Sequence, residues 1–212
     1  MSSIRNYLYQ MKIIITESQS QLLIEQVEGL DEFREITLSS YPEVEEYWDV
    51  IENFIRLSGV KRIEVEPIRM GVAVSLITGI IFNKNAFSQP LTAFLFTIFH
   101  ELAHQYQYRK YGKEKMLKLY TSEMSIEEAA KFMKEIEEVA DELATRKLRE
   151  LQKYGYLADV NIPKGFYKQL SLKSFENTIR YLKSQVEDSG LTSPDEISDL
   201  FYNWLKDKVQ PI

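Results

Sequence analysis

The sequence predicts an α+β fold, in which a small mixed sheet is followed by a helix-rich C-terminal half. Runs rich in β-branched and aromatic residues, which are typical of strands, occur at 11–16, 60–67 and 72–83. The second half of the chain is dominated by long segments with apolar residues at helical spacing. With 212 residues and 44% hydrophobic content, the chain can bury a sizeable core. We therefore expect a single domain over 1–212, with 160–212 as a helical C-terminal portion.

The N-terminal third is expected to mix helices with strands. Helices are predicted at 18–27 and 42–57, between the strands predicted at 11–16 and 60–67. Whether residues 1–10 are ordered or disordered is left open. They show no basic region followed by a long apolar core, so we expect no secretory signal and a cytoplasmic protein.

The segment Val72–Asn83 predicts one or two strands, and Gly79 within it can mark a turn or a bulge. Residues 88–90, SQP, are typical of a helix start, and the following run Leu91–Phe99 is apolar on nearly all sides. A helix of that kind belongs in a core. The apolar stretch ends near Ala103 and is shorter than the roughly 20 residues needed to cross a bilayer, so no membrane span is expected.

The only two histidines of the chain, His100 and His104, lie four residues apart in the string HELAH. At about 100° per residue, the two imidazoles are roughly 40° apart on one helix face and one turn apart, so both can reach one cation. Glu101 lies at the flank of that face, where it can act on a metal-bound water as a general base without being a ligand. The alternative is a chance HExxH string on a helix. The placement of both histidines around a glutamate favours the metal site.

A catalytic zinc usually takes three protein ligands, so a third ligand is needed. Other HExxH patterns would place a third histidine where this chain has Tyr108 and Lys110. The remaining candidate for the third ligand is a carboxylate from another helix. The best source is the segment 125–154, which has no Gly or Pro and begins with a possible capping box of Ser125 and Glu128.

Glu137 lies in the middle of the apolar stripe of this predicted helix. Buried charges are normally paired or metal-bound, so Glu137 is the predicted third ligand. Asp141, one turn later, borders the same face and can accept a hydrogen bond from the free ring nitrogen of a ligand histidine. Ala130, Ala140 and Ala144 would let this helix approach its partner closely. The alternative is an amphipathic helix with one carboxylate at a tolerated position.

The string HELAH followed by EEVAD at 137–141 resembles the gluzincin arrangement of HExxH with a downstream ExxAD or ExxxD helix. Thermolysin-like enzymes and the membrane-bound heat-shock and prenyl-protein proteases share that arrangement. The resemblance covers roughly residues 74–150 and implies zinc as the cofactor. By this resemblance, zinc would be held by His100, His104 and Glu137. Glu101 would act as the general base, and Asp141 would orient a ligand histidine.

The resemblance also implies a zincin-like fold, in which the last strand before the active-site helix is an edge strand that binds extended substrate through its backbone. That strand would contain Ile80, Ile81, Phe82 and Asn83; an ordinary sheet strand is the alternative. Thermolysin-like enzymes carry a further histidine that stabilises the transition state, and this chain has none left. Other side-chain donors lie downstream, and nothing in the sequence selects among them: Arg146, Tyr154, Tyr156 and Tyr167.

Two more helices are predicted near the C-terminus. One covers 175–186, and the other begins at Ser193 as N-cap with a proline in its first turn. The apolar residues of the second helix are expected to pack on the body of the protein, with a partner-binding groove as the alternative. These residues are Leu200, Phe201, Trp204 and Leu205.

Composition excludes several functions. The net charge of −6 gives no basic surface for nucleic acid, and the absence of cysteine excludes disulfides and thiolate zinc sites.

We predict a zinc metalloendopeptidase that cleaves peptides or proteins with a metal-activated water and a glutamate general base. A catalytically silent protein with a structural or assembly role, and a hydrolase of non-peptide amides, are the alternatives. Nickel, cobalt and iron also suit a His₂Glu site. The sequence leaves the oligomeric state open.

Overall fold

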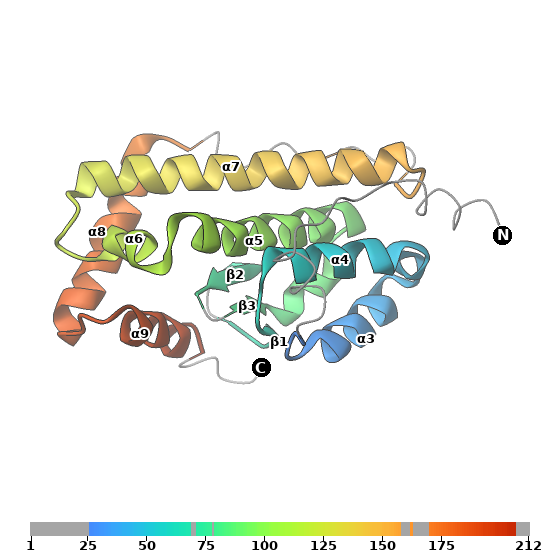
Figure 1. The fold of residues 1–212 in the computed structure, drawn as a ribbon, viewed down its shortest axis with the longest axis horizontal. Helices are drawn as coiled ribbons and strands as arrows, with labels where there is room; N and C mark the ends of the chain where they lie inside the picture. Colours follow the sequence, from blue (N-terminus) through green and yellow to red (C-terminus); the bar gives the residue numbers. More distant parts are fainter. Residues whose placement is uncertain (1–25, 69–70, 78, 158–161, 163–169, 207–212) are drawn as a thin grey trace.

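The computed structural model describes residues 26–68, 71–77, 79–157, 162 and 170–206. These residues form the predicted α+β architecture, in which helices predominate and one small sheet lies near the middle (Figure 1). The predicted strand at 11–16 and nearly all of the predicted helix at 18–27 lie outside the described residues, as do residues 1–10.

The elements follow one another in a simple order. The α-helices are α3 (Leu30–Ser40), α4 (Trp48–Ser58), α5 (Leu91–Tyr111), α6 (Lys113–Leu117), α7 (Ile126–Lys153), α8 (Leu172–Ser189) and α9 (Pro194–Lys206). The strands are β1 (Ile63–Val65), β2 (Ala73–Leu76) and β3 (Gly79–Phe82), and the short 3₁₀ helices are η1 (Pro42–Tyr47), η2 (Lys84–Ser88) and η3 (Lys118–Tyr120).

The sheet has the strand order β1-β3-β2. β3 pairs with β1 in parallel, with Ile63 opposite Ile80, and with β2 in antiparallel, with Leu76 opposite Gly79. A side chain at position 79 would not fit, because a Cβ atom there would lie 2.4 Å from the carbonyl oxygen of Arg62. Gly79 thus allows the close approach of β1 that completes the sheet.

The prediction that Ile80, Ile81, Phe82 and Asn83 lie on an edge strand is wrong. β3 is the central strand, all four of its residues are buried, and its backbone is paired on both sides. Asn83 follows the strand, and its side-chain amide donates to the carbonyl of Ile68 at 3.0 Å. The sequence indicates which residues are extended but not the order of the strands. That order depends on β1, which pairs with β3 on the side opposite to β2. The two edge strands of the described sheet are β1 and β2.

Helix α5 lies between the sheet and α7, with α7 running along its length (Figure 1). Gln105 fixes α5 to the β2–β3 hairpin, because its buried amide nitrogen donates to Ser75 Oγ at 2.6 Å and to the Leu76 carbonyl at 2.7 Å. The apolar run before the histidines is buried in the main core, where Phe94 stacks on Tyr41 with ring centroids 4.9 Å apart. The helix that carries HELAH is therefore held on both sides.

Helix α7 begins as predicted at a capping box. The Ser125 hydroxyl accepts from the Glu128 N–H at 3.2 Å, and a Glu128 carboxylate oxygen accepts from the Ser125 N–H at 3.1 Å. Ala130, Ala140 and Ala144 are fully buried, in keeping with the close approach that their small size permits. This approach brings one face of α7 onto α5.

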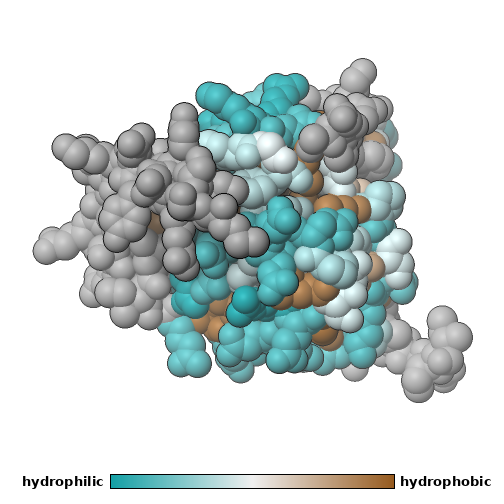
Figure 2. Space-filling view, turned by 90° about the vertical axis from the view of Figure 1, so that its right-hand side faces the viewer, coloured by the Kyte–Doolittle hydropathy of each residue, from teal (hydrophilic) through white to brown (hydrophobic). Residues whose placement is uncertain are grey.

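The N-terminal helices differ from the prediction. Helix α3 was not predicted, because its pattern of apolar residues is weak and it begins after Gly29, which takes a left-handed conformation at φ 77°. The helix predicted at 42–57 is present as two pieces, η1 and α4. Both pieces bury aromatic rings in the core beside α5. On the described part of the face shown in Figure 2, small apolar patches are separated by hydrophilic residues.

The two predicted C-terminal helices are present as α8 and α9. Lys183 on α8 is buried, and its ammonium donates to the carbonyls of Thr121 and Met124, which ties the loop before α7 to α8. Tyr202 on α9 donates to the Glu64 carboxylate on β1 at 3.0 Å. The predicted packing of α9 residues is confirmed for Leu205, which lies in a small core with Leu76. Within the described residues, no helix is long and apolar enough to span a membrane.

Candidate metal centre

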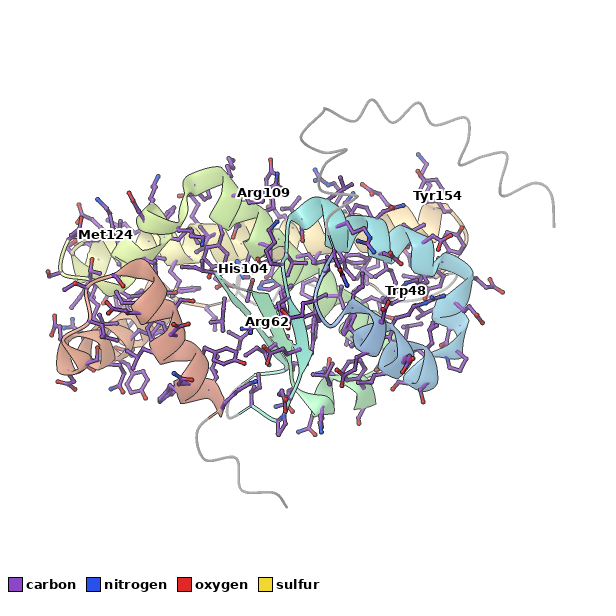
Figure 3. The ribbon with its side chains drawn as sticks, turned by 60° about the horizontal axis from the view of Figure 1, so that its bottom comes forward. Trp48, Arg62, His104, Arg109, Met124 and Tyr154 are labelled. Atoms are coloured by element: carbon purple, nitrogen blue, oxygen red, sulfur yellow. The ribbon has the colours of Figure 1, made fainter. Side chains whose placement is uncertain are left out.

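The structure brings His100 and His104 of α5 together with Glu137 of α7. The Nε2 atoms of the two histidines are 3.0 Å apart, and Glu137 Oε2 lies 3.1 Å from that of His100 and 3.3 Å from that of His104. Both histidines are buried, and the Glu137 side chain is 16% exposed. Among the described residues, these three form the one group of His, Asp and Glu side chains with ligand atoms close enough to share a metal ion. Figure 3 shows His104 near the middle of the molecule.

The size of this triangle suits a small metal ion. Three ligand atoms in a tetrahedral zinc site, each about 2.0–2.1 Å from the ion, are about 3.3 Å apart. The observed separations of 3.0, 3.1 and 3.3 Å lie close to that value. Two imidazole nitrogens and one carboxylate oxygen are also a known donor set for catalytic zinc. The three residues therefore fit zinc in both geometry and chemistry.

Gln107 determines which nitrogen of His104 faces the triangle. The Gln107 amide nitrogen donates to the carbonyl of Ile136 on α7 at 2.8 Å, so its amide oxygen is left as an acceptor. That oxygen lies 2.8 Å from His104 Nδ1, which must then carry a proton and donate it. The Nε2 lone pair of neutral His104 consequently points at the other two ligand atoms.

The sequence analysis did not identify Gln107 as part of the site. It follows His104 by three residues, which places it on the same helix face, and that spacing was the available signal. Its partner, the backbone carbonyl of Ile136, comes from the turn that carries Glu137. Because that pairing depends on how α5 and α7 cross, the role of Gln107 appears only in the fold.

Asp141 holds His100 in the same way and in the predicted position. The Nδ1 atom of His100 lies 3.1 Å from Asp141 Oδ1, and the Asp141 side chain is almost fully buried. A carboxylate can only accept, so the Nδ1 proton of His100 lies toward Asp141 and its Nε2 atom faces Glu137. In their neutral forms, both histidines therefore direct lone pairs toward a carboxylate oxygen. Three acceptors at this distance repel one another unless a proton or a metal ion lies between them.

The pKa shifts of the three residues show the same preference for positive charge. Burial by itself lowers the pKa of His100, but the contacts with Asp141 and Glu137 outweigh it and raise that pKa to about 10. Burial likewise opposes the charge of His104, and the Glu137 carboxylate nevertheless raises its pKa. Burial raises the pKa of Glu137, but the two histidines bring it down to about 2. Without metal, the group holds protons in the place where a cation fits.

Glu101, the predicted general base, directly follows His100 on α5. It is buried, and the backbone N–H of Ser75 on β2 hydrogen-bonds to it. Burial raises the pKa of its carboxyl above the ordinary value, although the charges of His100 and His104 pull it down. A carboxylate with a raised pKa is a stronger base than an exposed one. Glu101 is therefore a buried and more basic carboxylate next to the predicted metal ligand His100.

Two tyrosines that the sequence analysis did not select lie near this group. Burial and the charges of Glu101 and Glu137 raise the pKa of Tyr108, and its hydroxyl donates to the Ser75 carbonyl at 3.3 Å. Burial and the charge of Glu137 raise the pKa of Tyr120 to about 12. Both phenols therefore stay protonated at neutral pH.

The donors suggested by sequence position do not gather at the site. Arg146 is exposed, Tyr154 is 51% exposed, and Tyr156 packs on Tyr47 with ring centroids 5.0 Å apart. Tyr167 lies outside the described residues. The residues that the fold brings to the metal group are instead Tyr108 and Tyr120.

Comparison of the chain with protein-family models, with curated proteins and with solved structures finds no match. The buried group of His100, His104 and Glu137 could hold a metal ion. Glu101 is a further buried carboxylate beside it that is not one of these ligands.

Proposed function

We propose that the protein is a zinc-dependent metallopeptidase that hydrolyses peptide bonds in a peptide or protein substrate. The observation that carries the proposal is the convergence of His100 Nε2, His104 Nε2 and Glu137 Oε2 within 3.0–3.3 Å of one another, with Glu101 buried beside them. The similarity of HELAH and EEVAD to the gluzincin arrangement supports the same function.

The residues of the site have distinct roles in this proposal. Zinc would be held by His100, His104 and Glu137, and when bound it would supply a Lewis acid and lower the pKa of water. Glu101 takes a proton from the water that attacks the carbonyl carbon and passes it to the nitrogen of the leaving amine as the C–N bond breaks. Burial raises the pKa of Glu101, which favours both the uptake and the later transfer of the proton.

The substrate backbone would pair with β2, which replaces the predicted edge at Ile80–Asn83. β2 is the edge strand next to α5, and its residue Ser75 contacts both Glu101 and Gln105. An extended peptide added to this edge would form main-chain hydrogen bonds with β2 next to Ser75, whose own N–H and C=O already bond to Glu101 and Tyr108. This edge thus gives the substrate a position along α5.

Tyr120 is the proposed side-chain donor to the oxygen of the attacked carbonyl. Its hydroxyl has no hydrogen-bond partner among the described residues, whereas that of Tyr108 already donates to the Ser75 carbonyl. The Glu137 charge and burial raise the pKa of Tyr120 to about 12, so the phenol keeps the proton that it would donate.

The Glu101→Gln variant tests the peptidase proposal. The zinc-loaded variant and wild type are incubated with a mixture of peptides of varied sequence, and the products are identified by mass spectrometry. We expect wild type to cleave and Glu101→Gln to retain zinc while losing at least about 100-fold in rate, since general-base catalysis contributes about 10²–10⁴-fold. Glu135→Gln, at an exposed position of α7, is the control and should cleave normally.

The same experiment separates the proposal from a structural role for the metal. A site that only supports the fold has no need of a general base. If zinc-loaded wild type cleaves none of the peptides, or if Glu101→Gln cleaves as fast as wild type, the peptidase assignment is wrong. A catalytically silent protein with a structural or assembly role would then be the better account.

A further inference from the structure

An apolar pocket of about 530 Å³ lies between β2 and the C-terminal helices. This volume is within the range of about 300–1,000 Å³ that is common for binding sites of small ligands. None of the described residues that line it is charged. Its main apolar wall residues are Val74, Leu76, Leu117, Leu182, Phe201 and Trp204.

The pocket and the proposed catalytic group share a wall. Ser75 lines the pocket, while its backbone N–H hydrogen-bonds to Glu101. Tyr108 also lines it and donates to the Ser75 carbonyl at 3.3 Å. Tyr120, the proposed donor to the attacked carbonyl, is a third residue that lines the pocket. A chain bound along β2 would therefore pass the general base and the pocket together.

Aromatic pairs from the C-terminal helices form the outer part of the pocket. Tyr181 of α8 and Trp204 of α9 have ring centroids 6.1 Å apart, and Tyr181 is 46% exposed. Phe201 of α9 meets the Tyr120 ring edge-on, with centroids 5.1 Å apart. Both α8 and α9 lie beyond residues 74–150, to which the gluzincin similarity is confined, so this pocket is a feature of the chain itself.

One polar group in the wall is also available to a ligand. Ser198 lines the pocket and is 3% exposed, and its hydroxyl has no hydrogen-bond partner among the described residues. Buried hydroxyls are normally hydrogen-bonded, because an unpaired one costs free energy. A phenol or amide group on a ligand in this pocket would supply the missing partner.

We propose that this pocket binds one large apolar side chain of the substrate, aromatic or long aliphatic, next to the bond that is cleaved. This inference rests on the proposed peptidase function. The uncharged wall favours apolar groups, since a charged side chain would lose its hydration there without a counter-charge. Its position beside Ser75 sets that side chain close to Glu101 along β2.

Peptide hydroxamates that differ in one side chain test this proposal without requiring turnover. The hydroxamate group chelates zinc, and the variable position is Gly, Ala, Leu or Phe. Dissociation constants for the zinc-loaded protein are measured by calorimetry. We expect the Phe and Leu compounds to bind at least about tenfold more tightly than the Gly compound, because burial of such a side chain contributes about 1.5–3 kcal/mol, or about 10- to 150-fold.

A variant that fills the pocket supplies the specific test. Thr178 of α8 lines the pocket from an exposed position, so Thr178→Trp adds bulk without entering the core. Its preference for Phe over Gly should fall to near unity, while its affinity for the Gly hydroxamate stays unchanged. Thr178→Ser leaves the pocket open and should behave like wild type. Asn177→Trp, on the same rim, gives a second and independent blockade.

The outcomes distinguish the pocket from the peptidase activity. Tight binding of all four hydroxamates with equal affinity, or a preference that survives in both Trp variants, would overturn the pocket proposal while leaving the metal site. A preference for Phe that Thr178→Trp removes, in a protein that cleaves no peptide, would support the pocket and overturn the peptidase function. If no hydroxamate binds to the zinc-loaded protein, the proposed substrate pocket is wrong as well.

Discussion

The Nδ1 atom of His100 lies 3.1 Å from Oδ1 of Asp141, a carboxylate that is buried in α7 one turn after Glu137. His104 is held differently, by the neutral amide of Gln107 at 2.8 Å. The two ligand histidines thus have unequal supports, one charged and one neutral. The charged contact should make His100 the more basic ligand.

Asp141→Asn should weaken zinc binding by about 10- to 100-fold, since loss of a charged partner of a ligand histidine typically has that effect. The change keeps the size of the side chain, so the helix content should remain. Competition with a chromogenic chelator measures the affinity. Asp199→Asn, at an exposed position of α9, is the matched control. Equal affinities of Asp141→Asn and wild type would exclude this support of His100.

Two substitutions of Gln107 should separate its two roles, which are to accept from His104 and to donate to Ile136. Gln107→Leu removes both the acceptor for His104 and the donor to Ile136, so we expect weaker zinc binding and a loss of about 1–3 kcal/mol in the free energy of unfolding. Gln107→Glu keeps an acceptor for His104, but it replaces the donor to Ile136 with a second acceptor oxygen and adds a negative charge. It should retain zinc affinity but lower stability, as measured by urea unfolding and chelator competition. Equal loss of zinc affinity in both variants would contradict the proposed tautomer.

Ala140→Leu should disturb the site through the spacing of α5 and α7. Ala140 is fully buried on α7 and lies three residues after Glu137, so the isopropyl group that leucine adds must displace its neighbours. Overpacking of this kind costs about 1–3 kcal/mol, and we expect zinc affinity to fall as Glu137 moves from the histidines. Glu135→Leu makes the same helix more apolar at an exposed position and should change neither. Normal stability of Ala140→Leu would show that the helices are not closely packed here.

The contact between α9 and the sheet should depend on pH through Glu64. Burial raises the pKa of Glu64, but contacts with Lys206, Tyr202 and Arg62 outweigh it and bring the pKa below 4.5. A carboxyl whose pKa is lower in the folded state stabilises the fold above its unfolded pKa, and this stabilisation is lost as the pH falls through the folded value. Wild type should thus exceed Glu64→Gln in free energy of unfolding at pH 7, and the difference should shrink below about pH 4.5. A difference that does not change with pH would contradict this account of the contact.

The main features of the site could be predicted because they depend on local spacing. His100 and His104 share a helix face by their separation alone, and Glu137 stands out as a carboxylate on an apolar stripe. The capping box at Ser125 fixed the start of the helix that carries Glu137. Each inference required only the geometry of a single helix and the cost of burying a charge.

Features that depend on pairing between distant segments were missed. β3 is a central strand because β1 pairs with it from outside the hairpin, and nothing within Ile80–Asn83 indicates that neighbour. Gln107 acquires its role only where α5 meets the carbonyl of Ile136. The pocket beside Ser75 likewise requires α8 and α9 to fold back onto β2. The order of strands and the docking of helices are set by tertiary contacts, which local patterns do not encode.

Metal content per chain tests the central claim most directly. The protein is purified without chelator and without a histidine tag, and zinc is measured by elemental analysis in wild type, His104→Ala and Glu137→Ala. We expect about one zinc per wild-type chain and clearly less in both variants, since each loses one of three ligands. Wild-type protein that binds no metal even after zinc is added back would contradict this claim, and HELAH would then be a coincidence on a buried helix.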